Sequence, residues 1–300
     1  MKILLFGKNG QVGWELQRSL APLGELVALG TDSRDLCGDF TDLDGIAQTV
    51  RSVAPDVIVN AAAYTAVDKA ESEPDVARTI NALAPGVLAE AAKRCGAWLL
   101  HYSTDYVFDG SGDQPWLETD KTAPLNVYGQ TKLEGEQAIL VSGCQHLIFR
   151  TSWVYAARGN NFAKTMLKLA QQRDSLQVID DQFGAPTGAE LLADVSVHAL
   201  RVALQRPDVG GLYHLVAGGE TSWHGYAHFV IDSARRAGMD IKVAPEAIAA
   251  VASSAFATAA KRPHNSRLNT DKLQDTFGLH LPHWQHGVTR MLSEIIGKTS

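Results

Sequence analysis

The sequence predicts an α/β fold in which a doubly wound parallel sheet carries a second, smaller lobe made from the C-terminal part of the chain. Three observations predict this fold. Short apolar runs alternate with helical patterns over the first 150 residues, a glycine-rich turn follows the first run, and the alternation loosens after Arg150. Short apolar strands that alternate with helices are typical of a parallel sheet covered on both faces.

The composition is that of an ordinary globular protein of 300 residues, with 45% hydrophobic residues, 20% charged residues and a net charge of -6. No long basic run is present, so we expect no nucleic-acid partner. Three cysteines, Cys37, Cys95 and Cys144, have neither metal-ligand nor disulfide spacing. The N-terminus has no signal-peptide layout and no apolar stretch approaches membrane-spanning length, so we expect a cytoplasmic protein with no membrane partner.

The first half of the chain is expected to contain five strands and four helical stretches. The strands are expected at residues 2–6, 26–29, 57–59, 98–102 and 147–151, and the helices at 11–20, 43–53, 76–94 and 126–138. Pro85 is expected to kink or split the third helical stretch, because proline lacks a backbone donor and its ring clashes with the preceding turn.

The second half is expected to be less regular. Helices are expected at residues 162–172, 191–204, 222–237 and 285–296, with a strand at 212–216 and a helix followed by a mobile loop in the Ala-, Val- and Ser-rich stretch 243–260. We expect residues 1–152, with roughly 176–208, to form a dinucleotide-binding domain, and roughly 153–175 with 209–300 to form a substrate-binding lobe.

The glycine-rich turn joins the first strand to the first helix with the pattern G-x-x-G-x-x-G. Glycines allow a tight turn and let backbone N–H groups approach a pyrophosphate, which then faces the helix N-terminus. A glycine-rich turn between an N-terminal strand and a helix is a strong indication of a Rossmann-type, dinucleotide-binding sheet. The candidate cofactor-binding residues of this turn are Gly7, Asn9, Gly10, Gln11, Val12 and Gly13.

Two further segments agree with a dinucleotide site. One follows the second strand at a distance suited to the adenine end of the cofactor, and the other ends the third strand with small side chains. These candidate residues are Asp39, Phe40, Ala61, Ala62 and Ala63. Near the end of the second strand, Asp32 favours a ribose hydroxyl whereas Arg34 favours a 2′-phosphate, so the choice between NADH and NADPH stays open.

Tyr128 and Lys132 stand four residues apart, so on a helix both side chains lie on one face. A nearby ammonium favours the phenolate, so we expect Lys132 to lower the pKa of Tyr128 and the pair to move a proton to or from a substrate oxygen. Thr104 ends the fourth strand, and open α/β sheets place their ligands at the carboxyl ends of strands. We therefore expect these three residues to converge.

With these motifs in place, the chain resembles the extended short-chain dehydrogenase/reductases and, within them, the family of dTDP-4-dehydrorhamnose reductases. The resemblance runs nearly the whole length. Beside the glycine-rich turn it is carried by NAAAYTAVD at 60–68, STDYVFDG at 103–110, YGQTK at 128–132, RTSWVY at 150–155 and RPHNS at 262–266.

The resemblance implies an NAD(P)H-dependent oxidoreductase that reduces the 4-keto group of dTDP-4-dehydro-L-rhamnose to dTDP-L-rhamnose. Tyr128 would give a proton to the developing alkoxide, Lys132 would lower the tyrosine pKa and hold the nicotinamide ribose, and Thr104 would hydrogen-bond the carbonyl oxygen. The residues implied to bind the nucleotide-sugar substrate are Thr65, Val67, Asp68, Asp105, Tyr106, Trp153 and Arg262.

The resemblance also implies a homodimer joined through Mg²⁺, a cation that prefers oxygen ligands in octahedral geometry. The candidate ligands are Glu15, Glu190 and Glu294.

Two alternatives stay open: another nucleotide-sugar epimerase or reductase of the same superfamily, and a non-catalytic dinucleotide-binding regulatory subunit. A dehydratase is disfavoured because Asp105 is followed by Tyr106 rather than by a glutamate. The presence of Thr104, Tyr128 and Lys132 together favours an enzyme over a regulator.

Overall fold

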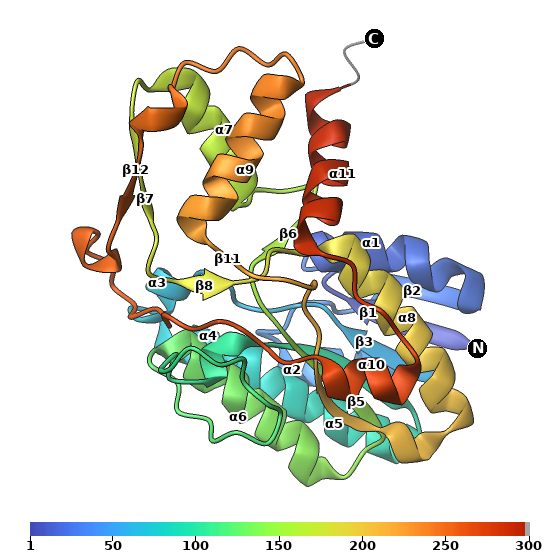
Figure 1. The fold of residues 1–300 in the computed structure, drawn as a ribbon. Helices are drawn as coiled ribbons and strands as arrows, with labels where there is room; N and C mark the ends of the chain where they lie inside the picture. The colour runs from blue at the N-terminus through green and yellow to red at the C-terminus, as the bar shows by residue number, and fades with distance from the viewer. Residues whose placement is uncertain (298–300) are drawn as a thin grey trace.

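A computed structural model describes residues 1–297, with a six-stranded sheet at the base of the molecule (Figure 1). The strands lie in the order β10-β5-β4-β3-β1-β2, and every neighbouring pair is parallel. They are β1 (Lys2–Phe6), β2 (Glu25–Leu29), β3 (Val57–Asn60), β4 (Trp98–Thr104), β5 (His146–Thr151) and β10 (Gly211–His214).

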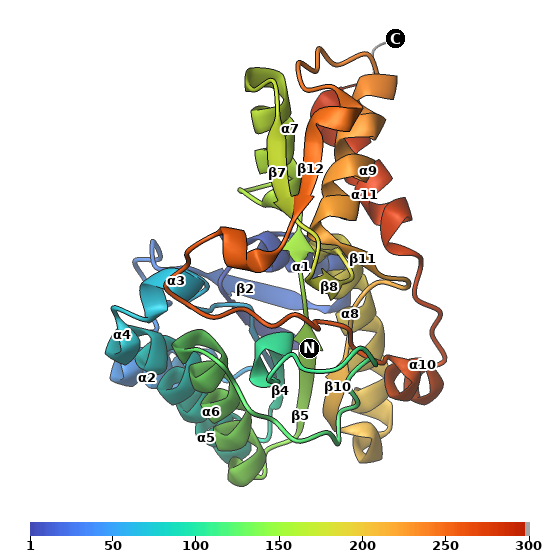
Figure 2. The ribbon, with the colours of Figure 1, turned by 60° about the vertical axis from the view of Figure 1, so that its left-hand side comes forward.

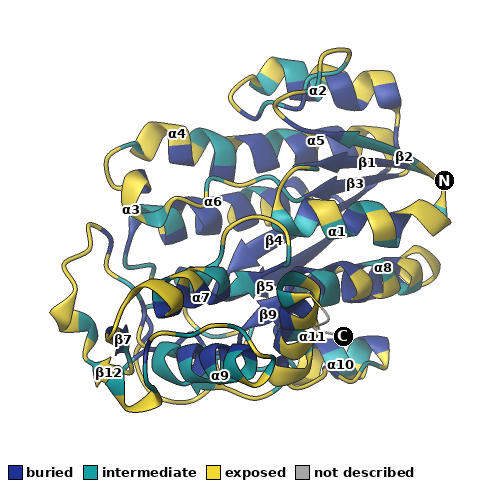
Figure 3. Ribbon diagram, turned by 90° about the horizontal axis from the view of Figure 1, so that it is seen from above, coloured by how far each residue is buried: buried dark blue, intermediate teal, exposed yellow. Residues whose placement is uncertain are grey.

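Helices cover both faces of this sheet: α1 (Gln11–Leu20) and α8 (Ala189–Gln205) one face, and α2 (Leu43–Val53), α5 (Ala84–Cys95) and α6 (Val127–Ser142) the other. Successive strand residues point to opposite sides, so on β1 Ile3 and Leu5 pack toward α1 and α8, whereas Leu4 and Phe6 pack toward α2 and α5. Figure 3 shows the strands as a buried layer between the helices. The predicted α/β, doubly wound parallel sheet is confirmed.

The strand order reverses beside β1, whose two neighbours are β2 and β3. Ligands of open α/β sheets bind at such a switch point, outside the carboxyl ends of the strands. The glycine-rich turn leaves β1 here, and Ala61 follows β3. Gly7 has a φ of +85°, and a Cβ on it would lie 2.6 Å from the backbone of Ala61, so the close approach of the two loops requires glycine at this position.

The predicted helical stretch 76–94 is irregular but not broken, because its helical backbone continues through a π-helical turn. α3 (Val67–Ala70) is followed by α4 (Pro74–Arg78), then by a π-helical turn at Thr79–Leu83, and then by α5. Pro85 is the second residue of α5, which follows the π-helical turn directly within one continuous run of helical backbone. The wider turn therefore absorbs the interruption ahead of the proline.

The second lobe stands beyond the carboxyl edge of the sheet (Figure 2). Its core includes Tyr226 and Trp284, whose rings meet edge to face at 5.7 Å. The lobe consists of the helices α7 (Phe162–Gln172), α9 (Trp223–Arg236) and α11 (Trp284–Ile296), with the parallel strand pair β7 (Leu176–Ile179) and β12 (Ile248–Val251).

Two very short strand pairs lie between the lobe and the sheet. They are β6 (Val154–Tyr155) with β9 (Thr187–Gly188), and β8 (Phe183–Gly184) with β11 (Thr221–Ser222). Among residues 1–297, none of the helices combines the length and apolar character needed to span a bilayer.

One expectation about the second half needs correction, and the predicted division into domains stays a prediction. Residues 243–260 form no helix: β12 runs between two short 3-10 turns, because pairing with β7 supplies backbone partners that override the helical preference of alanine. Within the predicted 176–208 segment, β7 pairs with a strand of the lobe rather than joining the main sheet. Within the predicted 209–300 lobe segment, β10 pairs with β5 of the main sheet, and α10 (Asp271–Phe277), an unpredicted helix, packs against it.

Candidate active site

A cavity of about 430 Å³ opens at the carboxyl edge of the sheet, beside the switch point. The loops that follow β1, β3, β4 and β5 form its walls together with the start of α6, and Trp223 of α9 closes it from the lobe. The fold therefore brings together six segments of the chain.

All three predicted catalytic residues line this cavity. Thr104 is the last residue of β4, and Tyr128 and Lys132 lie one turn apart in α6. The Asn126 side chain caps α6 by accepting a hydrogen bond from the Gly129 N–H at 2.8 Å, which fixes where the helix begins. The Tyr128 phenol and the Thr104 hydroxyl lie close enough to interact, and this interaction lowers the pKa of Tyr128.

Burial raises the pKa of Tyr128 to about 12, and the Asp105 carboxylate acts in the same direction, while the hydrogen bond to Thr104 opposes them. The prediction that Lys132 lowers this pKa is wrong for the structure as described. Burial dominates the pKa of Tyr128. The Lys132 nitrogen is bonded instead to two groups of β4.

Those two groups are the Tyr102 carbonyl oxygen, 2.5 Å from the Lys132 nitrogen, and His101 Nε2, 3.3 Å from it. Lys132 is only 2% exposed. Burial lowers its pKa to about 8, although the Glu136 carboxylate raises it. Arg150 binds Glu136 through two hydrogen bonds of 2.9 and 2.7 Å, so the negative charge near Lys132 is already paired.

Asp105 follows Thr104 and is 2% exposed. Its Oδ1 accepts a hydrogen bond of 3.1 Å from the Thr104 hydroxyl. Burial raises the pKa of this carboxyl to about 6, against the hydroxyls of Ser266 and Thr104, which lower it. A carboxyl with such a pKa changes its protonation just below neutral pH.

Several cavity-lining residues carry buried side-chain oxygens that have no hydrogen-bond partner within residues 1–297. These atoms are Ser103 Oγ, Asp105 Oδ2, Thr151 Oγ1 and Ser152 Oγ. Buried polar atoms are nearly always hydrogen-bonded in native proteins, so four unsatisfied oxygens around one cavity indicate that polar groups of a ligand or water complete this site. Ser103, Thr151 and Ser152 are absent from the predicted site, although they lie inside the motifs STDYVFDG and RTSWVY, which could have indicated them.

The cofactor turn reaches the same cavity through Gly10, Gln11 and Val12, and the loop after β3 reaches it through Ala61 and Ala63. Gly10 is the N-cap of α1 and makes no side-chain cap, so the N–H groups of the first helical turn are available to an anion. This arrangement fits the pyrophosphate of a dinucleotide.

Four other predicted cofactor residues support this turn without lining the cavity. A Cβ on Gly13 would lie 2.0 Å from the Gly7 carbonyl oxygen, so both glycines allow α1 to pack against the turn. Asn9 Nδ2 donates to Asp32 Oδ1 at 2.9 Å, and the Ala62 N–H donates to Asn60 Oδ1 at 3.0 Å.

Asp39 and Phe40 lie away from the cavity. Asp39 Oδ1 accepts hydrogen bonds from the N–H and the hydroxyl of Thr41, and Phe40 is buried with its ring edge-on to Phe6 at 5.3 Å. Their contacts are those of a loop cap and a core residue, and their predicted role at the adenine end stays a prediction.

Five of the predicted substrate-binding residues line the cavity: Thr65, Val67, Asp105, Tyr106 and Trp153. Trp153 stacks on Trp223 with ring centroids 3.6 Å apart and planes 14° from parallel. Trp223 is absent from the prediction, since it lies 70 residues further along the chain and nothing near it resembles a binding motif.

The remaining two are Arg262, which lines a second cavity of about 660 Å³, and its ion-pair partner Asp68. Arg262 lines that cavity, pairs with Asp68 at 2.7 Å and hydrogen-bonds Tyr106. Tyr106 and Trp223 line both cavities, so the two spaces adjoin. The far wall of the second cavity comes from α7 and β7 of the lobe.

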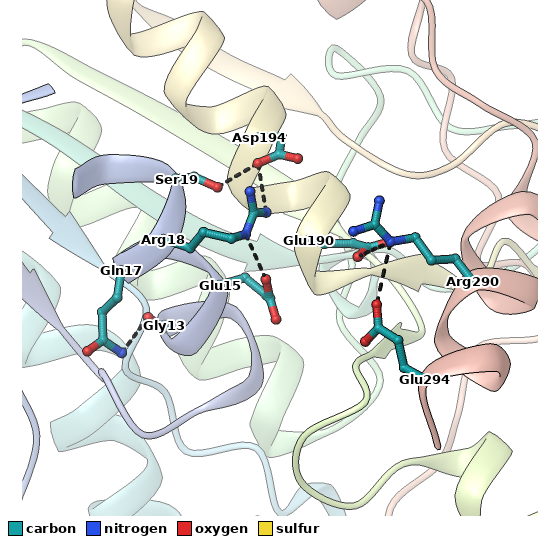
Figure 4. A network of polar contacts seen from close by, with 9 residues as sticks. All are labelled: Gly13, Glu15, Gln17, Arg18, Ser19, Glu190, Asp194, Arg290 and Glu294. Carbon is teal, nitrogen blue, oxygen red and sulfur yellow. Dashed lines mark hydrogen bonds and ion pairs between the residues drawn. The ribbon is translucent and has the colours of Figure 1, made fainter. Parts of the chain in front are cut away.

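The predicted metal ligands lie in another place, where α1, α8 and α11 meet (Figure 4). Glu15 pairs with Arg18 at 3.3 Å, and Arg290 lies between Glu190 at 3.3 Å and Glu294 at 3.5 Å. Within residues 1–297, no group of three or more His, Cys, Asp or Glu side chains is arranged to hold a metal ion. The magnesium prediction thus has no support from this geometry.

Comparison with known proteins agrees with the site. The family model described as RmlD substrate binding domain matches residues 1–296. The chain is similar to the dTDP-4-dehydrorhamnose reductase of Shigella flexneri, with 64% identity over 300 residues that cover all of both chains.

Two solved structures are also similar. The dTDP-4-dehydrorhamnose reductase of Clostridium acetobutylicum has 34% identity and a TM-score of 0.87, covering 98% of this chain and 99% of that one. The Bacillus anthracis enzyme, solved in complex with NADP, has 33% identity and a TM-score of 0.85, with the same coverage. The fold, the cavity and these full-length matches agree, and the chain belongs to the RmlD substrate binding domain family, together with the dTDP-4-dehydrorhamnose reductases.

Proposed function

We propose that this protein reduces the 4-keto group of dTDP-4-dehydro-L-rhamnose to give dTDP-L-rhamnose, using NADH or NADPH. One observation carries the proposal: a single cavity is lined both by the cofactor turn, through Gly10 and Val12, and by Thr104, Tyr128 and Lys132. A proton donor and a place for a dinucleotide thus lie in one space. The relatives that are similar over the full length carry the same activity in their names.

A bound nicotinamide cofactor would supply the hydride that goes to the sugar C4. Tyr128 donates its proton to the carbonyl oxygen as negative charge develops there, and the Thr104 hydroxyl stabilises the phenolate that remains. Positioned proton transfer of this kind contributes about 10²- to 10⁴-fold in rate. Because the pKa of Tyr128 is about 12 in the described structure, the donor stays protonated throughout the physiological pH range.

The sugar hydroxyls are proposed to satisfy the unpartnered oxygens of Ser103, Asp105, Thr151 and Ser152. The nucleotide end is proposed to occupy the second cavity, which adjoins the first at Tyr106 and Trp223. Arg262 lies at that junction, where its planar guanidinium can bind the diphosphate in bidentate fashion after leaving Asp68.

The choice between NADH and NADPH depends on the loop after β2. Asp32 is exposed, lies 3.5 Å from Lys8 Nζ and accepts from Asn9. Arg34 is exposed beside it. A 2′-phosphate would be attracted by Lys8 and Arg34 and repelled by Asp32, so Asp32→Asn is expected to shift the ratio of kcat/KM values toward NADPH.

A homodimer, a bound Mg²⁺ and a cytoplasmic location stay predictions. Mg²⁺ at Glu15, Glu190 and Glu294 would have to displace Arg290, which now lies between two of these carboxylates. Light scattering of the protein with Mg²⁺ and with a chelator tests the metal and the dimer together: a molar mass that does not change on chelation would contradict a metal-dependent dimer.

The proposed activity is tested by mixing the protein with dTDP-4-dehydro-L-rhamnose and each reduced cofactor in turn. A reductase consumes one equivalent of NADH or NADPH for each sugar reduced. An epimerase of the same superfamily converts the sugar without net oxidation of the cofactor, and a regulatory subunit does neither. Absence of cofactor oxidation at high protein concentration would overturn the proposal.

A further inference from the structure

Beneath the catalytic residues lies a buried polar chain formed by Asn60, His101 and Lys132. Asn60 and His101 are each 1% exposed, and they are direct register partners on the parallel strands β3 and β4. Lys132 reaches them from α6 and is 2% exposed. No water is needed to connect the three side chains, because their polar atoms are already in contact. Buried polar groups in such a chain must each match a donor to an acceptor.

The orientation of the Asn60 amide is fixed by the backbone. Its Oδ1 accepts a hydrogen bond of 3.0 Å from the Ala62 N–H. Turning the amide over would place its NH₂ group against that N–H, donor against donor. The NH₂ group therefore faces His101, with Nδ2 2.9 Å from His101 Nδ1.

That contact fixes the proton on His101. Nδ1 has to accept the hydrogen bond from Asn60, so it carries a lone pair. A neutral imidazole with a lone pair on Nδ1 carries its proton on Nε2. Burial and the Lys132 charge both lower the pKa of His101 well below its usual value, so the ring stays neutral.

The Nε2–H of His101 then points at the Lys132 nitrogen, 3.3 Å away. An ammonium has three N–H groups and no lone pair, so it cannot accept this hydrogen bond. A neutral amine can: it accepts from His101 with its lone pair and donates to the Tyr102 carbonyl oxygen, 2.5 Å away. The donor of His101 is thus matched only by the uncharged form of Lys132.

The other groups around Lys132 do not change this match. Tyr128, on the same helix, is neutral because burial raises its pKa. Glu136, one turn further along α6, favours the ammonium, but Arg150 of β5 pairs with it through two hydrogen bonds. Burial of Lys132 itself already lowers its pKa to about 8.

We propose that Asn60 and His101 are positioning residues that tune Lys132: Asn60 holds His101 in the Nε2–H tautomer, and this N–H, directed at the Lys132 nitrogen, favours the amine over the ammonium. Lys132 therefore takes up its proton less readily than its burial alone dictates, and its charge depends on which tautomer His101 adopts. The inference deepens the proposed function through Lys132, but the tautomer and the lysine titration exist whether or not that function is correct.

The tautomer is read directly by ¹⁵N NMR of protein labelled in its histidines, because a ring nitrogen with a lone pair and one with a proton resonate far apart. The expected result is a lone pair on His101 Nδ1 and a proton on Nε2 at neutral pH. In Asn60→Asp, the second carboxylate oxygen accepts from Nδ1–H, so the tautomer is expected to invert. A wild-type His101 with its proton on Nδ1, or on both nitrogens, would overturn the proposal.

The lysine is read by ¹³C NMR of protein labelled at lysine Cε, titrated in the absence of substrate. In His101→Gln, the side-chain amide can turn its oxygen toward Lys132, so the titration midpoint of Lys132 is expected to move up by about one pH unit, a tenfold gain in proton affinity. This variant adds no charge, unlike Asn60→Asp, and it keeps the proposal testable if the buried aspartate prevents folding.

The matched control is His198→Gln on α8, where His198 binds the Phe277 carbonyl oxygen away from the cavity. It should leave the Lys132 titration unchanged. If the titration midpoint of Lys132 is the same in His101→Gln as in the wild type, His101 does not favour the amine form and the proposal is refuted. If the proposed reductase activity is absent while both NMR results hold, the proposed function fails and the tuning stands. If the activity is present, the alkaline limb of the kcat profile should follow the Lys132 midpoint in the wild type and the variant.

Discussion

The cavity has two walls of different composition: the wall on the side of the sheet holds the proposed reacting groups, and the wall on the side of the lobe holds aromatic side chains proposed to bind the substrate. The sheet-side wall carries Thr104, Asp105 and Lys132, each at most 5% exposed and bonded to a neighbouring strand or side chain. The lobe-side wall presents the aromatic faces of Trp153 and Trp223, which are half-buried and held mainly by stacking. Reacting groups need fixed positions and a controlled local charge, which regular strands supply. A binding face needs area, which segments far apart in the chain can supply together.

The comparison predicts that losing the proton donor of the sheet-side wall has the largest effect. Tyr128→Phe should lower kcat by about 10²- to 10⁴-fold while the dissociation constant of the reduced cofactor stays the same, because only the proton transfer is lost. Steady-state kinetics and a fluorescence titration measure the two quantities. Tyr226→Phe is the control, since its hydroxyl is buried in the lobe with no partner among residues 1–297 and takes no part in the cavity. Wild-type turnover in Tyr128→Phe would contradict the assignment of the proton donor to the sheet-side wall.

The buried Asp105 carboxylate of the sheet-side wall is also predicted to lower the free energy of unfolding at neutral pH. The folded-state pKa of Asp105 is raised to about 6, so the folded protein binds a proton there more tightly than the unfolded chain, and its stability falls as pH rises from about 4 to 6. Asp105→Asn removes this loss and should stabilise the protein at pH 7 by up to about 3 kcal/mol. Denaturant unfolding at pH 4 and pH 7 measures the effect, which should be largest at pH 7.

The control for that prediction is Asp109→Asn. The pKa of Asp109 is lowered by hydrogen bonds from Ser111, so its charged form favours folding. The substitution should therefore destabilise the protein slightly at pH 7, the opposite sign to Asp105→Asn. Equal effects of the two variants would show that burial does not set the charge behaviour of this wall.

The lobe-side wall is predicted to act on binding. Trp223→Ala removes an aromatic face that lines the cavity and should raise the KM for the nucleotide sugar about tenfold, with kcat changed far less, because contact of a ligand with that face contributes about 1 kcal/mol. Trp223→Phe keeps a stacking ring and should restore most of the affinity. A fall in kcat equal to the rise in KM would mean that this wall also positions the reacting atoms.

The smallest effect is expected where the two walls meet. Asp68→Asn breaks the partly exposed pair with Arg262 and should change the free energy of unfolding by less than about 1 kcal/mol. Arg262 is then free to bind an anion, so the KM for the nucleotide sugar should fall slightly. A measured rise in KM would place Asp68 in contact with the substrate instead.

The parts of this site that could be predicted are those whose sequence pattern is contained within a few neighbouring residues. The turn Gly7–Gly13 and the spacing of Tyr128 and Lys132 are each contained in a few residues, and the structure places both at one cavity. The contact of Lys132 with His101 depends on the packing of α6 against β4, which no short pattern reveals. The direction of the Tyr128 pKa shift follows from the burial of the phenol, which no short sequence pattern reveals either.

The lobe was harder to predict for the same reason. The strand Ile248–Val251 has an alanine-rich sequence that favours a helix, and only its partner at Leu176–Ile179 makes it a strand. Trp153 and Trp223 likewise stack across 70 residues of chain. Sequence patterns indicate the secondary structure that a segment prefers in isolation. The structure of this wall depends instead on contacts with distant segments.

The position of α11 in the chain has a consequence for synthesis. The last strand of the main sheet ends at His214, whereas the core that holds α9 in place depends on Trp284 and Val288 of α11. A growing polypeptide therefore possesses every strand of its sheet well before it possesses the helix that steadies Trp223. A chain that terminates between His214 and Trp284 has every strand of the main sheet but lacks α11, which packs against α9 in the lobe. The incompletely packed lobe helices of such a product are expected to be cleaved by proteases.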